Sequence, residues 1–418
     1  MLNRTIAPEI RELDEIKFIA PQKTIIGNHT SFIWMKDVPN ATSRIDFYFD
    51  AGSAKGSNVI SSLTAGLILA GTEQKSSTQI HNELDDLGAY FDASLNHEHS
   101  LLSFYALNDQ MLSVIDLFEE TIENASFPQH EIEELIRDRK QKQLINSEKV
   151  NFLAQRKFQQ LIFDGTPYSR VIDVKEYDSV QQSEIVNYFT ENYKKGLTKV
   201  VLVGDFTPNQ VATIQAKIEK WCVKNTPIYV SDFENKIEKA HVAKDNALQS
   251  AIRIGKVLFN KKHPDYLSFV ILNTILGDFF GSRLMKNIRE DKGYTYGIGS
   301  YVNELKMNGY FVIGTEVGKD VCEAAIAEIK KEIELLQTDL VREEELSLVR
   351  NYLLGQTLKS ADGPYALTDL FLTVEAHGLE LNFYNDFIHT LKTITPETLR
   401  ELAQKYLNWD SMTIVIAG

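Results

Sequence analysis

The sequence predicts an α+β fold with two homologous domains that face each other across a cleft. Each domain is predicted to be a mainly antiparallel sheet with helices packed on one face. Three observations carry this prediction. Short, turn-separated strands precede long amphipathic helices, and Ile45, Phe47 and Phe49 alternate as in a half-buried strand. The 418 residues exceed what one hydrophobic core usually supports. The second half of the chain also repeats the residue pattern of the first.

The internal repeat has a period near half the chain length. A helix, a glycine and a strand follow one another around Gly88, and the same order recurs around Gly293. Two amphipathic helices come next in each half. Their matched residues are Ile115, Phe118, Ile122, Glu131, Leu135, Ile136 and Arg137 in the first half and Ile326, Ile329, Ile333, Glu344, Leu348, Val349 and Arg350 in the second. We therefore predict an N-terminal domain over 1–222, a polar linker over 223–247 and a C-terminal domain over 248–418.

Each half closes with a helix that leads into a buried-looking strand, VVLVG at 200–204 and TIVIAG at 413–418. Two further helix starts are marked by a threonine followed by a proline, at Pro208 and at Pro396. Threonine is a good N-cap residue, and proline fits the first turn of a helix. These signals predict one helix after the last strand of the first half and one before the last strand of the second.

Composition and charge exclude several classes of protein. Lys and Arg number 44 against 58 Asp and Glu, and this net charge of −14 argues against a nucleic-acid-binding surface. Cys222 and Cys322 are too few for a disulfide framework or a thiolate zinc site. The N-terminus lacks the apolar run of a secretory signal, and the longest apolar stretch, near Tyr266 to Phe280, is too short to span a bilayer. We expect a cytoplasmic protein with neither a nucleic-acid nor a membrane partner.

The stretch from Gly277 to Gly299 predicts a helix, a glycine turn at Gly293 and an extended segment that begins at Tyr294. Arg289 in the last helical turn and Tyr296 just past the glycine are then able to project toward one site. A guanidinium and a phenol aimed at one point can hydrogen-bond a peptide carbonyl and stabilise an oxyanion. In the alternative interpretation, Arg289 caps its helix or pairs with a neighbouring carboxylate, while Tyr296 fills a sheet surface.

The same stretch resembles the C-terminal-half signature of the pitrilysin/insulinase-like zinc metallopeptidases of the mitochondrial-processing-peptidase type. The segment R-E-D-K-G-Y-T-Y matches the family pattern at Arg289, Gly293 and Tyr296, whereas Tyr294 replaces the usual leucine. The resemblance covers nearly the whole chain. It implies two peptidase-like domains around a chamber that holds an extended peptide, with Arg289 and Tyr296 as substrate-binding residues that face a zinc ion.

The zinc motif of that family is missing from the sequence. Active members carry H-x-x-E-H on a helix of the first half, in which two histidines bind zinc and the glutamate polarises water. Matched through the Gly-Thr pair at 71–72, the motif positions fall on Ser62, Ala65 and Gly66. The third-ligand position falls on Gln143, with Gln141 as the alternative. The resemblance therefore implies a degenerate site that holds no zinc and no catalytic residue in this chain alone.

Other metal and nucleophile motifs give little support for an autonomous enzyme. The nine histidines form no H-E-x-x-H, and their single tight cluster is His97-Glu98-His99. On a strand, His97 and His99 share a face, but two ligands without a third make a weak metal site, so we predict a solvated strand end. No G-x-S-x-G elbow and no Walker loop occurs.

Taken with the resemblance, these residues predict the non-catalytic subunit of a heterodimeric zinc endopeptidase. Its partner would be a homologous, zinc-motif-bearing subunit, and zinc would be bound by that partner and not by this chain. Arg289 and Tyr296 would help to bind an extended peptide and to stabilise the oxyanion at the partner's zinc. The alternative is an inactive homologue that acts as a structural or peptide-binding scaffold, for which a homodimer is also open. An autonomous peptidase with a rearranged metal site is a third interpretation.

Overall fold

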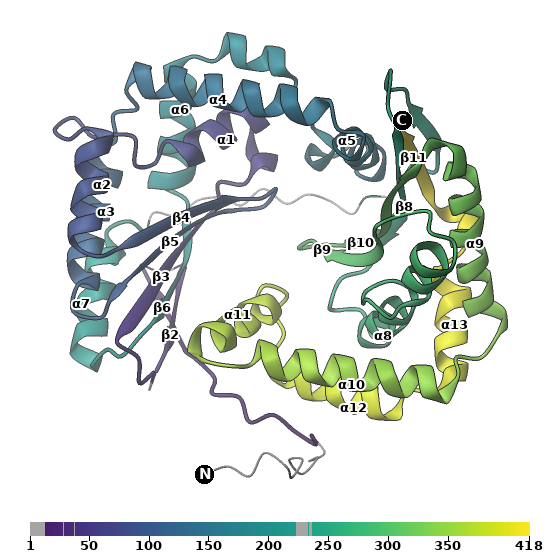
Figure 1. Ribbon diagram of the computed structural model, residues 1–418. Helices are drawn as coiled ribbons and strands as arrows, with labels where there is room; N and C mark the ends of the chain where they lie inside the picture. Colours follow the sequence, from purple (N-terminus) through teal and green to yellow (C-terminus); the bar gives the residue numbers. More distant parts are fainter. Residues whose placement is uncertain (1–12, 28, 37, 223–232, 234–235) are drawn as a thin grey trace, which may run out of the picture.

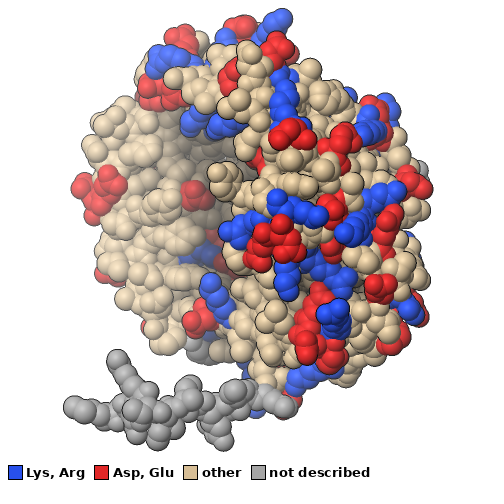
Figure 2. All heavy atoms as spheres, turned by 45° about the vertical axis from the view of Figure 1, so that its right-hand side comes forward, with Lys and Arg blue, Asp and Glu red and all other residues tan. Residues whose placement is uncertain are grey.

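The computed structural model describes residues 13–27, 29–36, 38–222, 233 and 236–418, and it consists of two similar halves. Figure 1 shows the first half in purple to teal and the second in green to yellow, arranged around a central space. Figure 2, in which side chains are drawn, shows a deep recess between the two halves. Among the described residues, no helix is long and apolar enough to cross a membrane.

The first half is built on a six-stranded sheet in the order β1-β2-β6-β3-β5-β4. All neighbours are antiparallel except β2 and β6, which are parallel. The strands are β1 (Gln22–Ile26), β2 (Thr30–Met35), β3 (Thr42–Phe49), β4 (Tyr90–Leu95), β5 (Ser100–Leu107) and β6 (Leu197–Val203). The helices are α1 (Asn58–Gly66), α2 (Ser77–Asp86), α3 (Met111–Asn124), α4 (Gln129–Ser147), α5 (Val150–Ile162), α6 (Gln182–Phe189) and α7 (Pro208–Glu219).

The second half has a five-stranded sheet in the order β7-β11-β8-β10-β9, again with one parallel pair, β7 and β11. The strands are β7 (Lys239–Val242), β8 (Gln249–Leu258), β9 (Ile298–Glu304), β10 (Gly309–Gly318) and β11 (Thr413–Ala417). The helices are α8 (Tyr266–Leu276), a π-helix over Met285–Asp291, α9 (Cys322–Thr338), α10 (Glu343–Ser360), α11 (Pro364–Glu375), α12 (Asn382–Thr393) and α13 (Pro396–Tyr406).

The strand orders confirm the predicted fold class and the duplication. The series β2-β6-β3-β5-β4 of the first sheet corresponds strand by strand to β7-β11-β8-β10-β9 of the second. Gly88 and Gly293 both take positive φ, +60° and +66°, a backbone conformation that glycine adopts with little strain after a helix. The predicted helix starts also hold, since Thr207 and Thr395 cap α7 and α13, each of which begins with a proline.

Two details differ from the sequence predictions. The extended segment after Gly293 becomes a strand only at Ile298 and not at Tyr294, because the Thr295 side chain hydrogen-bonds Gly297 of the same loop and Glu316 of β10. The first part of the predicted linker, 223–232 and 234–235, lies outside the described residues. Its later part contains β7, which pairs with β11 at the edge of the second sheet.

Each half sends one helix onto the sheet of the other half. Helix α5 packs on β8 and β11 of the second sheet, where Phe158 and Val415 share a buried cluster. The equivalent helix of the repeat, α11, lies against the first sheet, where Leu372 is buried against Ile33 and Val201. Helices therefore cover both faces of each sheet in part, rather than one face as predicted, because the second face is covered by the other half.

A polar junction joins the two halves at their equivalent hairpins. His97, Glu98 and His99 form the turn between β4 and β5, not a solvated strand end as predicted. Glu98 Oε1 accepts hydrogen bonds from the backbone N–H of Lys306, 2.8 Å away in the β9–β10 turn, and from the Tyr168 hydroxyl at 3.0 Å. The cluster is thus half-buried because it lies where the two halves meet.

Three histidines at or near this junction make stability depend on pH. Burial lowers the pKa of His97, His99 and His377 from the usual value, because the charged imidazolium is poorly solvated there. The unfolded chain therefore takes up protons first as the pH falls below about 6.5, and this favours unfolding. Between about pH 7 and about pH 5, we expect His377→Gln to lose less stability than the wild type in urea denaturation. Identical losses would show that His377 does not contribute.

Candidate functional site

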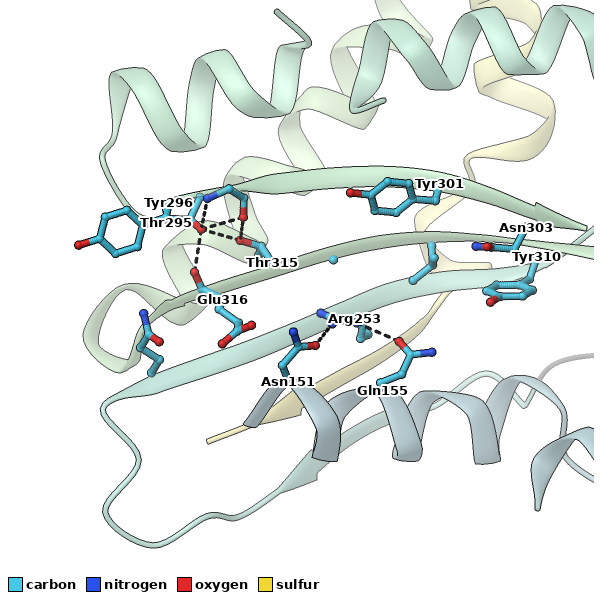
Figure 3. A pocket seen from close by; sticks show the side chains of 14 residues that line it. Asn151, Gln155, Arg253, Thr295, Tyr296, Tyr301, Asn303, Tyr310, Thr315 and Glu316 are labelled. Atoms are coloured by element: carbon cyan, nitrogen blue, oxygen red, sulfur yellow. Dashed lines mark hydrogen bonds between the residues drawn. The ribbon is translucent and has the colours of Figure 1, made fainter. Parts of the chain in front are cut away.

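A pocket of about 580 Å³ lies between α5 and the second sheet. Figure 3 shows its lining from close by, with α5 facing the layer of strands. The polar lining side chains include Asn151, Gln155, Gln249, Arg253, Thr295, Tyr296, Tyr301, Asn303, Tyr310, Thr315 and Glu316. Amide, hydroxyl and guanidinium groups of this kind can hydrogen-bond a peptide backbone.

Tyr296 stands at one end of this pocket, and its side chain is held out by its loop. The tyrosine is 95% exposed, so it does not fill a sheet surface as the alternative interpretation required. The hydroxyl of the preceding Thr295 donates to Glu316 O at 2.7 Å, and it accepts from Gly297 N at 3.1 Å and from Thr315 Oγ1 at 3.0 Å. The backbone is therefore fixed on both sides of Tyr296, while the phenol projects from the end of the sheet (Figure 3).

Arg253 links the pocket to α5 and was not predicted from the sequence. Its guanidinium donates to Gln155 Oε1 at 3.2 Å and to Asn151 Oδ1. Burial lowers its pKa, and the carboxylate of Glu316 opposes this effect. Gly314 lies opposite Arg253 on β10, where the missing side chain leaves room for the guanidinium. The available signal was a cation between two isoleucines, Ile252 and Ile254, which indicates a polar partner on another element.

Arg289 does not line the pocket that Tyr296 lines. Its guanidinium lies over the ring of Phe280, 4.6 Å from the centroid, in a cation–π contact. Phe280, which is 66% exposed, lines a neighbouring hollow that shares Gly297 and Tyr301 with the Tyr296 pocket. Tyr296 therefore lines one pocket, whereas Arg289 contacts a residue that lines the neighbouring hollow. For Arg289 to reach a ligand at Tyr296, its side chain has to leave Phe280.

The four degenerate zinc positions are divided among three places. Ser62 on α1 and Gln143 on α4 line one pocket of about 370 Å³, and Gln143 Nε2 donates to Ile172 O at 2.5 Å. Gln141, the alternative third position, is exposed. Ala65 is buried in the core of the first half. Gly66 is exposed and lines a different hollow, beside His81 of α2.

The side chains around Gly66 do not fit a zinc ion. A β-carbon placed on Gly66 would stand 3.0 Å from Leu135 Cδ2 and 3.5 Å from Arg139 Nη2. A guanidinium therefore occupies the space beside one motif position, and its positive charge disfavours a metal cation there. Within the described ranges, no three His, Cys, Asp or Glu side chains are grouped so that they could hold a metal ion.

Restoring the family motif should therefore give weak zinc binding while Arg139 remains. We expect the variant that combines Ser62→His, Ala65→Glu, Gly66→His and Gln143→Glu to bind zinc about tenfold or more weakly than the same variant with Arg139→Ala added. Chelator competition measures both affinities.

The control adds Arg137→Ala in place of Arg139→Ala. Arg137 is an exposed arginine of the same helix, and its removal changes the net charge equally. If the variant with the four motif substitutions binds zinc as tightly as the same variant with Arg139→Ala added, repulsion by the Arg139 guanidinium does not weaken zinc binding.

Comparison with known proteins agrees with this arrangement. The model of the family described as insulinase (peptidase family M16) matches residues 32–170, and the model described as peptidase M16 inactive domain matches 179–353. The chain is 20% identical to a probable inactive metalloprotease, YmfF, of Bacillus subtilis over 299 residues, 69% of this chain and 68% of that protein. It is 21% identical to the human mitochondrial-processing peptidase subunit beta over 414 residues, 90% of this chain and 80% of that protein.

A solved structure has the same fold. The structure of a peptidase M16 inactive domain from Pseudomonas fluorescens superposes with a TM-score of 0.86 at 21% identity, covering 95% of this chain and 98% of that one. The two family models together match most of the chain, on both sides of the internal repeat. This protein therefore belongs to peptidase family M16, the insulinase family.

Proposed function

We propose that this chain is the non-catalytic subunit of a two-subunit zinc endopeptidase and that it supplies Tyr296 and Arg289 to a partner's zinc site. The observation that carries the proposal is the exposed phenol of Tyr296, which projects from a loop whose backbone is tied to β10. A loop fixed in this way aims a hydrogen-bond donor without a large loss of entropy on binding. The matched zinc positions of the chain itself carry no ligand set, so the zinc would be the partner's.

The edge strand β9 offers a way to hold the peptide. It is the last strand of the second sheet and pairs on one side only, with β10. An extended peptide can add to such an edge through main-chain hydrogen bonds, which tolerate varied sequences. Because β9 begins two residues after Tyr296, a peptide on this edge would pass close to the phenol. The hydroxyl could then donate to a carbonyl oxygen as negative charge develops on it.

Similarity to a named subunit supports a role in a complex. The human relative is named as a subunit of the mitochondrial-processing peptidase, and the similarity extends over nine-tenths of this chain. An arrangement in which one family member carries the metal and another the arginine and tyrosine would account for a chain that keeps Arg289 and Tyr296 without the zinc motif.

Reconstitution tests the proposal. A homologous protein with an intact H-x-x-E-H motif, preferably from the same host, is mixed with this chain and assayed on a quenched fluorescent peptide. We expect each protein alone to be inactive and the mixture to cleave the peptide in a zinc-dependent manner. If such partners form a stable complex with this chain but remain inactive, or are fully active without it, the subunit role is wrong.

The second candidate function is an inactive scaffold or peptide-binding protein. Two observations favour it: the guanidinium of Arg289 is engaged by Phe280, and one relative is named a probable inactive metalloprotease. A scaffold should be recovered from its host as a homodimer or in a stoichiometric complex whose partner lacks H-x-x-E-H. Co-purification with identification of the partner separates the two functions.

A further inference from the structure

The pocket beside Ser62 and Gln143 is lined by four cations and, among the described residues, by no carboxylate. The cations come from three segments: Arg139 and Lys142 from α4, Arg156 from α5 and Arg170 from the loop after α5. This is unusual for a chain whose net charge is −14. Like charges gathered around one hollow repel one another, and an anion placed between them relieves that repulsion.

Two of these cations contact uncharged groups, and a third has a guanidinium nitrogen without a partner, so their charge is not compensated by these contacts. Arg139 Nε is buried and has no hydrogen-bond partner among the described residues. The guanidinium of Arg156 lies 5.5 Å from the ring centroid of Phe152, and Arg170 Nη1 donates to Gly56 O at 2.8 Å. By contrast, Lys140, which does not line the pocket, forms an ion pair with Asp178.

We infer that this pocket binds the carboxylate side chains of an acidic peptide. Arginine guanidinium groups bind carboxylates through paired, charge-assisted hydrogen bonds, and three of the four cations are arginines. Ser62, Gln143 and Asn146 add uncharged hydrogen-bonding groups to the lining. The pocket lined by Ser62 and Gln143, two positions matched to the family's metal site, is therefore suited to bind an anion and not a cation.

We assign the carboxylate to a peptide because helix α5 lines both this pocket and the Tyr296 pocket. Helix α5 contributes to both: Asn151 and Gln155 line the Tyr296 pocket, and Arg156 and Gln159 line the cationic one. A helix with its side chains is about 10–12 Å across, a distance that an extended chain spans in about four residues. A peptide held near Tyr296 can therefore place an acidic side chain between the arginines. This step rests on the proposed binding of peptides, but not on the role as a subunit.

Binding of labelled peptides to the full chain tests the inference. The probes are a fluorescein-labelled peptide of alternating Glu and Thr and the same peptide with Gln in place of Glu, followed by fluorescence anisotropy. We expect the Glu peptide to bind about a hundredfold more tightly and its affinity to fall with added salt. In the double variant Lys142→Gln/Arg156→Gln, the Glu peptide should bind about tenfold more weakly for each cation removed, whereas the Gln peptide should be unaffected.

The matched control is Arg137→Gln/Lys140→Gln, which removes the same charge from surface positions that do not line the pocket. Equal binding of the two peptides, or an equal loss in the control and pocket variants, would overturn the inference. Inorganic phosphate that binds as tightly as the Glu peptide would assign the pocket to a free anion and overturn it as well. Activity in the reconstituted pair is measured separately. A wild-type chain that shows no preference for the Glu peptide but supports full turnover in the pair therefore contradicts this inference alone.

Discussion

Replacing Tyr296 with phenylalanine should lower the turnover of the reconstituted peptidase about 10²–10³-fold, the effect of removing one hydrogen-bond donor from a developing oxyanion. The substitution deletes a single hydroxyl from a side chain that is 95% exposed, so the free energy of unfolding should stay unchanged. The loss should appear in kcat more than in KM, because the hydrogen bond strengthens as negative charge forms on the carbonyl oxygen.

The matched control is Tyr301→Phe, which deletes a hydroxyl from the same pocket but from the middle of β9. It should change kcat little. A companion variant, Phe280→Leu, removes the ring on which Arg289 rests but keeps its guanidinium. If Arg289 acts on the peptide after leaving Phe280, this variant should keep its activity while Arg289→Ala loses it. Full activity of Tyr296→Phe would exclude the oxyanion role and favour the scaffold.

Replacing Phe158 with alanine should destabilise the protein by about 3–5 kcal/mol, the usual cost of deleting a buried aromatic ring. Phe158 is 1% exposed, and it belongs to α5 of the first half although it packs on the sheet of the second. Gly255 on β8 makes room for the ring, since a β-carbon there would stand 2.9 Å from Phe158 Cζ. The cavity left by alanine therefore lies at the contact between the halves, where equilibrium denaturation should detect it.

The control for Phe158→Ala is Phe152→Ala, which removes the same atoms from the same helix at a half-buried position. It should cost much less, because fewer apolar contacts are lost. Limited proteolysis should also cut Phe158→Ala faster between the halves, since α5 is a main contact between them. Equal destabilisation by both variants would show that α5 is not anchored on the second sheet.

Much of the fold could be predicted from local residue patterns. Gly88 and Gly293 occupy equivalent positions after a helix in the two halves. Both take the positive φ that is favoured at a helix C-terminus. The Thr-Pro signals at Pro208 and Pro396 likewise mark real helix starts, because capping depends on residues next to one another in the chain. The boundary at Ile298 was missed, since the loop before it is held by Thr315 and Glu316, which lie on another strand.

The candidate site could be predicted only in part. The matched positions Ser62, Ala65, Gly66 and Gln143 follow from spacing along the chain, and no packing detail can turn them into the family's zinc ligands. The guanidinium of Arg139 next to Gly66 could not be foreseen, because it depends on how closely α1 and α4 approach. For the same reason, spacing suggested that Arg289 and Tyr296 share one site, whereas in the structure Arg289 lies over the exposed ring of Phe280 and does not line the Tyr296 pocket.

The sequence by itself determined the duplication, the α+β class and the missing H-x-x-E-H motif, because each depends on residue type and spacing along the chain. The tertiary structure alone decided that α5 and α11 each pack on the sheet of the other half. It also decided that cations from α4, α5 and the loop after α5 surround one pocket. The physical reason is that burial and charge clustering arise between segments far apart in the chain, and these are brought together by packing and not by local preference.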